Sequence, residues 1–166
     1  MSFPNRPGVD GHAQFSECGE YRYALVKRWG DGPSLAAILL NPSTATADED
    51  DPTVRRVVLR AQQMDFGSLI VLNVYAYRTT NPRELRLVAD PVGPENDRLI
   101  AELVTTADKV LIGWGNRGES RAPEIFSILA RVGVPVYRLG RPTRRGNPRH
   151  PLYLRKETEF ELVEPA

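Results

Sequence analysis

The chain has very little of the residues that build metal centres and disulfide frameworks. Its 166 residues include one cysteine, Cys18, and two histidines, His12 and His150. A single cysteine excludes an intrachain disulfide, and it equally excludes a four-cysteine zinc site or iron–sulfur cluster built from this chain alone. Two histidines are too few for a histidine metal site. We therefore expect no metal and no other cofactor.

Long hydrophobic runs and an excess of one charge are also absent. No run approaches the length of a transmembrane helix, and the N-terminus lacks the apolar region of a signal peptide. We therefore expect a cytoplasmic protein that does not contact a membrane. The 22 basic and 21 acidic residues leave a formal charge of +1, so the global charge does not demand a polyanionic partner.

The charges are nevertheless unevenly placed along the chain. Acidic side chains gather at Asp48 to Asp51, and this cluster is typical either of a magnesium site or, more commonly, of a solvated acidic turn. One late loop is basic instead, and it could contact phosphates or simply maintain solubility. Its basic residues are Arg138, Arg141, Arg144, Arg145, Arg149 and His150.

Length and composition fit a single domain. A chain of 166 residues with 41% hydrophobic content can bury a substantial core, so we expect one domain over residues 1–166. Residues 1–14 are polar and interrupted by glycine and proline, and we expect them to form a loose arm.

Four apolar runs organise the rest of the sequence, and each ends in small, amide or basic residues. The first run, residues 36–40, stops at Asn41-Pro42-Ser43-Thr44, where Pro42 fixes φ and removes a ladder donor. The other three runs end at Asn73, at Gly113-Trp114-Gly115-Asn116 and at the basic loop after Leu139. We interpret all four as buried strands.

Helical patterns between these runs predict parallel strands whose carboxyl ends share one edge. The expected fold is therefore α/β with three layers: a central, mostly parallel four-stranded sheet flanked by helices, preceded by an N-terminal β-hairpin. The hairpin strands are expected at 15–18 and 21–28. Helices are expected near 53–64, from Thr80, and over 95–106 and 122–132, with short strands at 152–154 and 160–163.

The strand ends supply the candidate site, because ligands of open α/β sheets bind outside the carboxyl ends of the strands. Asn41, Ser43 and Thr44 would project into that crevice. Asn41 could cap the turn, or its carboxamide could orient a water or hold a heterocycle, although an amide cannot serve as an ordinary general base. Asn73 could match a nucleobase edge with its paired donor and acceptor, or it could equally be a strand-end cap.

The third strand end is open to two interpretations as well. Trp114 could stack on a base, but a tryptophan in a strand more often fills the core. Gly113, Gly115 and Gly118 are typical of a loop that approaches phosphates, yet their spacing matches neither the dinucleotide nor the nucleoside-triphosphate fingerprint.

Taken together in chain order, the motifs are more informative than any single motif. It includes Tyr21-Arg22-Tyr23, Leu40-Asn41-Pro42-Ser43-Thr44-Ala45, Leu72-Asn73-Val74-Tyr75-Ala76-Tyr77-Arg78, Gly93-Pro94-Glu95-Asn96-Asp97 and Gly146-Asn147-Pro148-Arg149-His150-Pro151. In these motifs the chain resembles, over essentially its whole length, the bacterial and phage family catalogued as domain of unknown function 1643. The name of that family assigns no activity.

A more distant resemblance concerns the uracil-DNA glycosylase superfamily. In chain order that superfamily has a Gly-x-(Asp or Asn)-Pro motif, a base-reading asparagine, a Trp-Gly pair and a His-Pro-Ser motif. Here Leu39-Leu40-Asn41-Pro42, Asn73, Trp114-Gly115 and His150-Pro151 follow the same order. Leu39 replaces the first glycine, Leu152 replaces the final serine, and Ser43 stands where many members have an aromatic residue.

This resemblance implies a divergent DNA glycosylase that removes a damaged or mismatched base, with DNA as the partner. Asn41 would position the water, Asn73 would read the base edge and His150 would stabilise negative charge on the departing base. Further binding residues would be Pro42, Ser43, Thr44, Tyr75, Trp114, Gly115 and Asn116. The nucleic-acid backbone would be contacted by Arg141, Arg144, Arg145 and Arg149.

Two alternatives remain open from the sequence. The first is a non-catalytic protein that binds nucleic acid or nucleotides through the basic loop and the strand-end pocket. The second is an enzyme acting on a free nucleoside or nucleotide in a closed pocket.

Overall fold

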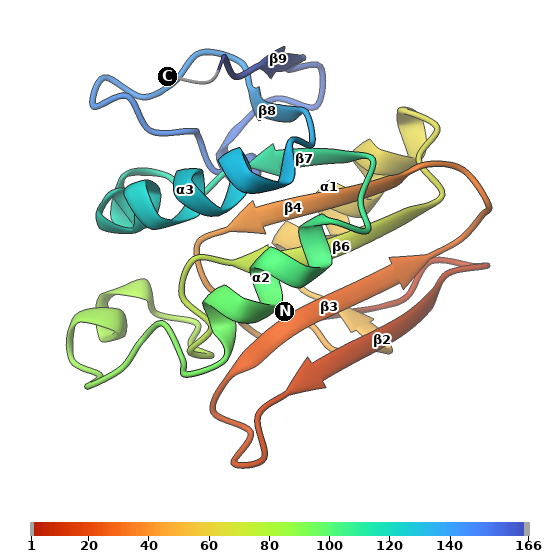
Figure 1. Cartoon of the computed structure of the whole chain (residues 1–166). Coiled ribbons are helices and arrows are strands. Elements are labelled where there is room, and N and C mark those ends of the chain that lie inside the picture. The colour runs from red at the N-terminus through yellow and green to blue at the C-terminus, as the bar shows by residue number, and fades with distance from the viewer. Residues whose placement is uncertain (1, 165–166) are drawn as a thin grey trace.

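The protein is a three-layer α/β structure in which helices cover both faces of one mixed sheet (Figure 1). The computed structural model describes residues 2–164. Within these residues the main sheet has seven strands. In spatial order they are β2 (Asp10–Phe15), β3 (Arg22–Arg28), β6 (Ser68–Asn73), β4 (Ser34–Leu39), β7 (Lys109–Ile112), β8 (Val136–Leu139) and β9 (Phe160–Leu162).

The sheet is larger and more mixed than the sequence predicted. Strands β6, β4, β7 and β8 pair in parallel, whereas β2, β3 and β9 are antiparallel to their neighbours. The expectation was four mostly parallel strands with a separate hairpin. Because β3 continues the ladder beside β6, with Leu25 opposite Val71, the hairpin is an edge of the same sheet. A polar segment near the C-terminus forms the other edge through β9.

Three α-helices within residues 2–164 connect the parallel strands. They are α1 (Pro52–Gln63), α2 (Asn96–Val104) and α3 (Ala122–Val132). The described part also contains the 3₁₀ helices η1 (Pro82–Arg86), η2 (Asn116–Arg121) and η3 (Pro151–Tyr153), and a two-stranded ribbon of β1 (Phe3–Pro4) and β5 (Glu49–Asp50). The helix predicted over 122–132 is confirmed, and those predicted near 53–64 and 95–106 are shifted or shortened at their ends.

The alternation of side chains along the strands divides the core into two halves. Ala36 and Ile38 of β4 face α2 and α3, where they pack in one cluster with Ile100 and Ile125. Leu35, Ala37 and Leu39 face the opposite way and pack against the apolar side of α1. Figure 1 shows α2 and α3 on one side of the sheet and α1 on the other. Both faces of the central strand are therefore buried, which explains its uninterrupted apolar sequence.

Two local predictions are corrected by the structure. Residues 10–14 were assigned to a loose arm and 15–18 to the first hairpin strand, but that strand is β2 at Asp10–Phe15, whose residues pair with β3 from Asp10–Arg28 to Phe15–Arg22. The strand expected at 152–154 is instead the helical turn η3. Pro151 opens this turn, and the backbone N–H of Leu152 donates to Nδ1 of His150. Proline is well suited to that first position because it has no N–H to satisfy.

The strand order places a topological switch point between β4 and β7. From β4 the chain crosses through α1 to β6 on one side, and from β7 it crosses through α3 to β8 on the other. In open α/β sheets the connections diverge at such a point and leave a crevice at the carboxyl ends of the strands.

Among residues 2–164 there is no helix with the length and apolar character needed to cross a membrane.

Candidate functional site

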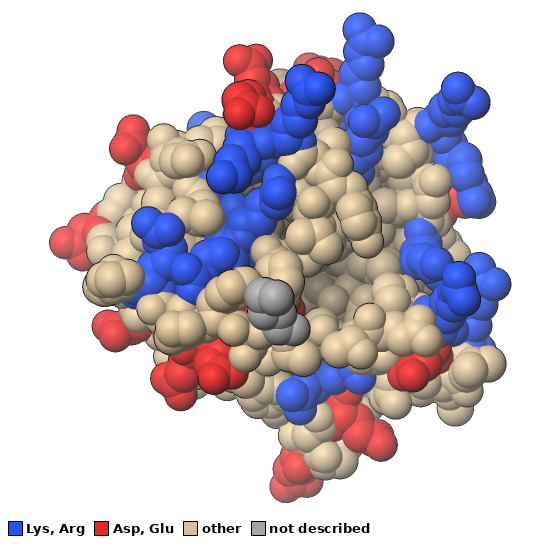
Figure 2. All heavy atoms as spheres, turned by 180° about the vertical axis from the view of Figure 1, so that it is seen from behind, with Lys and Arg blue, Asp and Glu red and all other residues tan. Residues whose placement is uncertain are grey.

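A cavity of about 690 Å³ lies at the switch point, at the carboxyl ends of β4 and β7. Its walls come from the turn after β4, the start of α1, the segment from Thr79 into η1, the loop after β7 and the segment from the basic loop to η3. Figure 2 shows a hollow on the rear face of the molecule, with Lys and Arg side chains standing on both sides of it. The volume falls within the range of about 300–1,000 Å³ that is usual for small-molecule and cofactor pockets.

Asn41 lies in the wall formed by the turn after β4. Its Nδ2 donates to the carbonyl oxygens of Pro42 at 3.0 Å and Thr79 at 2.9 Å. Both amide protons are thereby used, and this fixes which end of the carboxamide is oxygen. Since Asn41 lines the cavity and Oδ1 accepts no hydrogen bond from a described residue, the side chain offers an acceptor to a ligand or a water.

His150 lines the same cavity from the C-terminal side. Burial lowers the pKa of its imidazole from 6.5 to about 4, although the negative charge of Asp51 acts in the opposite direction. The ring is therefore neutral at pH 7. Its Nδ1 accepts from the Leu152 N–H at 3.3 Å, so the proton resides on Nε2. His150 is a neutral hydrogen-bond donor rather than a cation.

Glycines in the loop after β7 allow the segment that carries His150, residues 148–151, to pack closely against that loop. A Cβ on Gly113 would lie 3.0 Å from Cδ of Pro151 and 3.1 Å from the Arg149 carbonyl oxygen. Gly115 has φ of 69°, and its N–H donates to the Pro148 carbonyl at 2.8 Å. These glycines therefore serve loop packing, which is a different use from the phosphate approach considered for them.

Three arginines among the described lining residues, Arg117, Arg144 and Arg149, are exposed and make the cavity rim basic. Asp51 is the only acidic residue in the same lining. Arg117 was missed by sequence reasoning because it lies outside the basic loop. Of the four loop arginines predicted to contact a backbone, Arg144 and Arg149 line the cavity, whereas Arg145 forms an ion pair with Glu119 and Arg141 does not reach the lining.

An aromatic side chain also stands at the rim. Tyr153 is 83% exposed, lines the cavity and has its ring centroid 5.7 Å from that of His150. An exposed aromatic ring beside a basic pocket is a platform on which a nucleobase can stack. Sequence reasoning did not single out Tyr153 because it placed this residue in an expected strand.

Several predicted binding residues lie outside the cavity. Asn73 is only 2% exposed, and its Oδ1 accepts from Nη2 of the buried Arg22 at 3.3 Å. Tyr75 is half-buried, and its hydroxyl is paired with that of Ser120 at 2.9 Å. Pro42 is buried and Thr44 is exposed, and neither belongs to the lining. Ser43, Trp114, Gly115 and Asn116 do line the cavity together with Asn41 and His150.

Two of those lining residues have clear structural roles. Trp114 is 1% exposed and packs edge-on against Phe126, so its ring is mainly part of the core. Asn116 accepts at Oδ1 from the Thr143 hydroxyl at 2.7 Å and from Nδ2 of Asn147 at 3.0 Å. These bonds tie the loop after β7 to the basic loop, and they hold that wall of the cavity in one arrangement.

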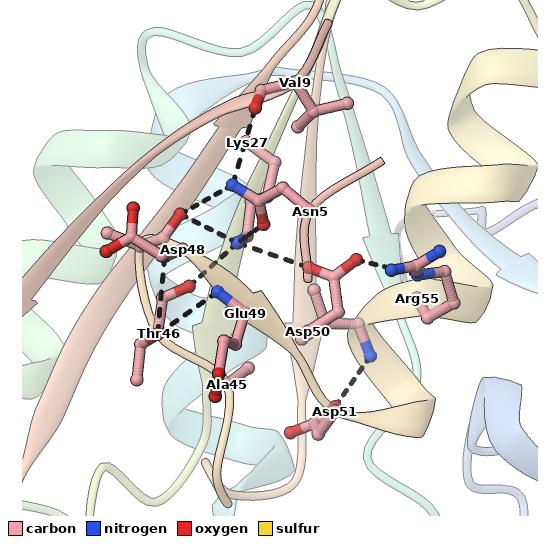
Figure 3. A network of polar contacts seen from close by, with 12 residues as sticks. Asn5, Val9, Lys27, Ala45, Thr46, Asp48, Glu49, Asp50, Asp51 and Arg55 are labelled. Atoms are coloured by element: carbon pink, nitrogen blue, oxygen red, sulfur yellow. Dashed lines mark hydrogen bonds and ion pairs between the residues drawn. The ribbon is translucent and has the colours of Figure 1, made fainter. Parts of the chain in front are cut away.

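The acidic cluster is divided by the fold (Figure 3). Asp50 is buried in a network around Lys27, whose Nζ lies 3.2 Å from its Oδ1, and it also pairs with Arg55 at 3.0 Å. Asp51 instead caps α1, where its Oδ1 accepts from the Val54 N–H at 2.8 Å. In residues 2–164 the structure contains no group of three or more metal-ligating side chains arranged to hold an ion.

A comparison with known families gives one match. The family described as a protein of unknown function, DUF1643, matches residues 22–152. This segment runs from the start of β3 into η3 and contains every wall of the cavity except its last residues. No curated protein and no solved structure matches the chain.

Proposed function

We propose that this chain, which belongs to the DUF1643 family, binds a nucleobase of a DNA strand in the cavity and hydrolyses its N-glycosidic bond. One observation carries the proposal: the free Oδ1 of Asn41 and the neutral imidazole of His150 line a single cavity with a basic rim. The order of motifs shared with the uracil-DNA glycosylase superfamily supports the same choice.

Hydrolysis of the N-glycosidic bond is favoured by a hydrogen-bond donor near the departing base. Cleavage of the bond leaves the electron pair, and so negative charge, on the base, and a fixed donor stabilises that charge most effectively in a site that excludes water. The Nε2–H of His150 has this character because the Leu152 N–H, bonded to Nδ1, fixes the tautomer that carries its proton on Nε2. Asn41 would hold the attacking water through Oδ1.

The remaining features of the cavity suit the rest of a nucleotide. Arg117, Arg144 and Arg149 supply positive charge for phosphates at the rim. Tyr153 offers a stacking surface for a base taken out of the helix, as enzymes that act on bases require. With Asn73 outside the cavity, the base edge would be read by other lining groups, among them Ser43 and the backbone near Gly115.

The test is a base-release assay on labelled single- and double-stranded oligonucleotides that carry uracil, mismatched, deaminated or alkylated bases. The sharpest variant is His150→Asn. The Oδ1 of the new asparagine can replace Nδ1 as the acceptor for the Leu152 N–H, whereas the donor at Nε2 is lost. We expect release by the wild type and a loss of about 100-fold or more in the variant.

Arg131→Gln, on the exposed part of α3, serves as the control and should keep the wild-type rate. Base release that is equal in His150→Asn and the wild type, or no release from any oligonucleotide, would contradict the proposal.

A second candidate, an enzyme or binder of free nucleotides, is favoured by the cavity volume alone, which suits one small molecule. Calorimetry separates the two. Tight binding of a mononucleotide with no measurable affinity for an oligonucleotide would select this candidate in place of the glycosylase.

A further inference from the structure

We propose that Asp51 is a catalytic residue of the same site and accepts the proton of the attacking water. The inference rests on the proposed function and extends it. In the sequence Asp51 is the last member of an acidic cluster, and its place before Pro52 marks it only as the start of a helix. The fold gives it a different environment from the other three.

The neighbouring residues of the cluster do not line the cavity. Asp50 points into the buried network, where Lys27 and Arg55 neutralise it. Asp48 and Glu49 are exposed, and their backbone N–H groups donate to the Thr46 hydroxyl. Figure 3 shows Asp51 apart from this network, joined only to the backbone at the start of α1. Of the cluster, Asp51 alone lines the cavity.

Only one of the two oxygens of the Asp51 carboxylate accepts a hydrogen bond from the protein. The side chain is 6% exposed, and its Oδ1 accepts from the Val54 N–H at 2.8 Å. Oδ2 accepts no hydrogen bond from any residue that the structure describes, which leaves it to a ligand or a water in the cavity. An N-cap role accounts for one oxygen, and a second oxygen without a protein donor, on a largely buried side chain that lines the cavity, is what points to chemistry.

The reaction needs a proton acceptor that the other lining residues do not supply. The carbon–nitrogen bond breaks with its electron pair going to the base, and the water oxygen forms the new bond to the sugar carbon. The proton lost by the water must then be taken up. Asn41 is a carboxamide and the Nδ1 of His150 is occupied by the Leu152 N–H, so neither can take it.

Asp51 is the one carboxylate in the described lining and takes the proton at Oδ2. The base, stabilised by the Nε2–H of His150, is protonated from solvent, and Asp51 returns its proton to solvent. The negative charge of Asp51 also favours the positive charge that develops on the sugar, so the same group acts at two points of the reaction.

Asp51→Asn is the decisive variant because asparagine is as good an N-cap as aspartate. It keeps an oxygen for the Val54 N–H and removes only the charge and the basicity. Asp48→Asn, in the same turn but exposed, is the matched control. The measurements are single-turnover base release across pH, affinity for the oligonucleotide, and the thermal midpoint of each protein.

We expect Asp51→Asn to lower the single-turnover rate about 100-fold or more, as loss of a general base does, while affinity and thermal midpoint stay close to wild type. The acid limb of the wild-type rate profile should vanish in the variant, a change that a purely structural cap would not cause. Asp48→Asn should keep both the rate and the limb.

Two results would overturn the inference. If the wild type releases base and Asp51→Asn does so at a similar rate, Asp51 is only a cap and the proposed function stands without it. If the wild type releases no base, the inference and the proposed function fail together.

Discussion

At the scale of single residues, the cavity combines groups whose hydrogen-bonding states are set by backbone contacts. The carbonyls of Pro42 and Thr79 orient the carboxamide of Asn41, and the Leu152 N–H selects the tautomer of His150. Such contacts make the site preorganised, because neither side chain has to reorient when a ligand enters. The residue types alone do not contain this geometry.

The lowered pKa of His150 leads to a prediction about stability and pH. The folded protein binds a proton at this ring only near pH 4, whereas the unfolded chain does so near 6.5. Between these values the unfolded state holds more protons, so the free energy of unfolding falls as pH falls. For the wild type we expect a loss from His150 of about 2 kcal/mol between pH 7 and pH 5.

Urea unfolding of the wild type and His150→Asn at both pH values isolates this contribution. The variant has no titrating ring and keeps an acceptor for the Leu152 N–H. Its loss between pH 7 and pH 5 should be smaller than that of the wild type. Equal losses would show that His150 is protonated normally in the folded protein.

Two of the residues singled out from the sequence lie just beyond the end of a central strand. Asn41 and Trp114 follow β4 and β7, and both line the cavity at the switch point. Asn73 is the last residue of β6, but β6 lies one strand away from that point, and its carboxyl end is closed by Arg22 and Asn96. The order of strands, which separates these cases, is set by tertiary pairing.

At the scale of secondary-structure elements, the turn between β4 and α1 is held in place by Lys27 of β3 (Figure 3). This lysine is fully buried, and its Nζ donates to Asn5 Oδ1 and to the carbonyls of Thr46 and Ala47 at 2.5, 2.8 and 3.1 Å. Burial lowers the pKa of the ammonium, while Asp50 opposes that shift. The network joins the β1–β5 ribbon to the sheet and so supports the wall that carries Asp51.

We predict that Lys27→Met lowers the free energy of unfolding by about 3 kcal/mol or more, because it leaves Asp50 and several carbonyls buried without their donor. The double variant Lys27→Met/Asp50→Asn should recover part of that loss, since the buried carboxylate that has lost its lysine partner and keeps only Arg55 is then gone. Lys156→Met, at an exposed position, should change stability by less than about 0.5 kcal/mol. Urea unfolding measures all three, and a negligible cost for Lys27→Met would contradict this account.

The elements themselves could be predicted where periodicity was strong. The apolar faces of α1 and α3 and the apolar run of β4 are visible in the sequence. Residues 10–14 gave no such signal, because β2 is an edge strand whose residues are mostly exposed. Its formation depends on the ladder with β3, a long-range contact that the local sequence does not encode.

At the scale of the whole molecule, a net charge of +1 conceals a local excess of positive charge around the cavity. Much of the remaining charge is compensated by neighbours, as in the pairs of Arg98 with Glu95 and Glu102 on α2. The rim arginines come from two separate loops, Arg117 after β7 and Arg144 and Arg149 after β8. Only the fold brings them to one edge, so the basic loop was recognisable from sequence but the rim was not.

The basic rim predicts how the affinity of the protein for nucleic acid depends on salt concentration. The affinity of a protein for nucleic acid falls with salt because bound counterions are released, and each phosphate contact adds about 0.7 to 0.9 to the slope of log affinity against log salt concentration. Replacing Arg117, Arg144 or Arg149 singly by glutamine should therefore reduce the slope for an oligonucleotide by nearly one. Arg131→Gln, on α3 and outside the cavity lining, should leave it unchanged. Fluorescence anisotropy at several salt concentrations provides the slopes. If the four variants and the wild type all had equal slopes, nucleic acid would not bind at this rim.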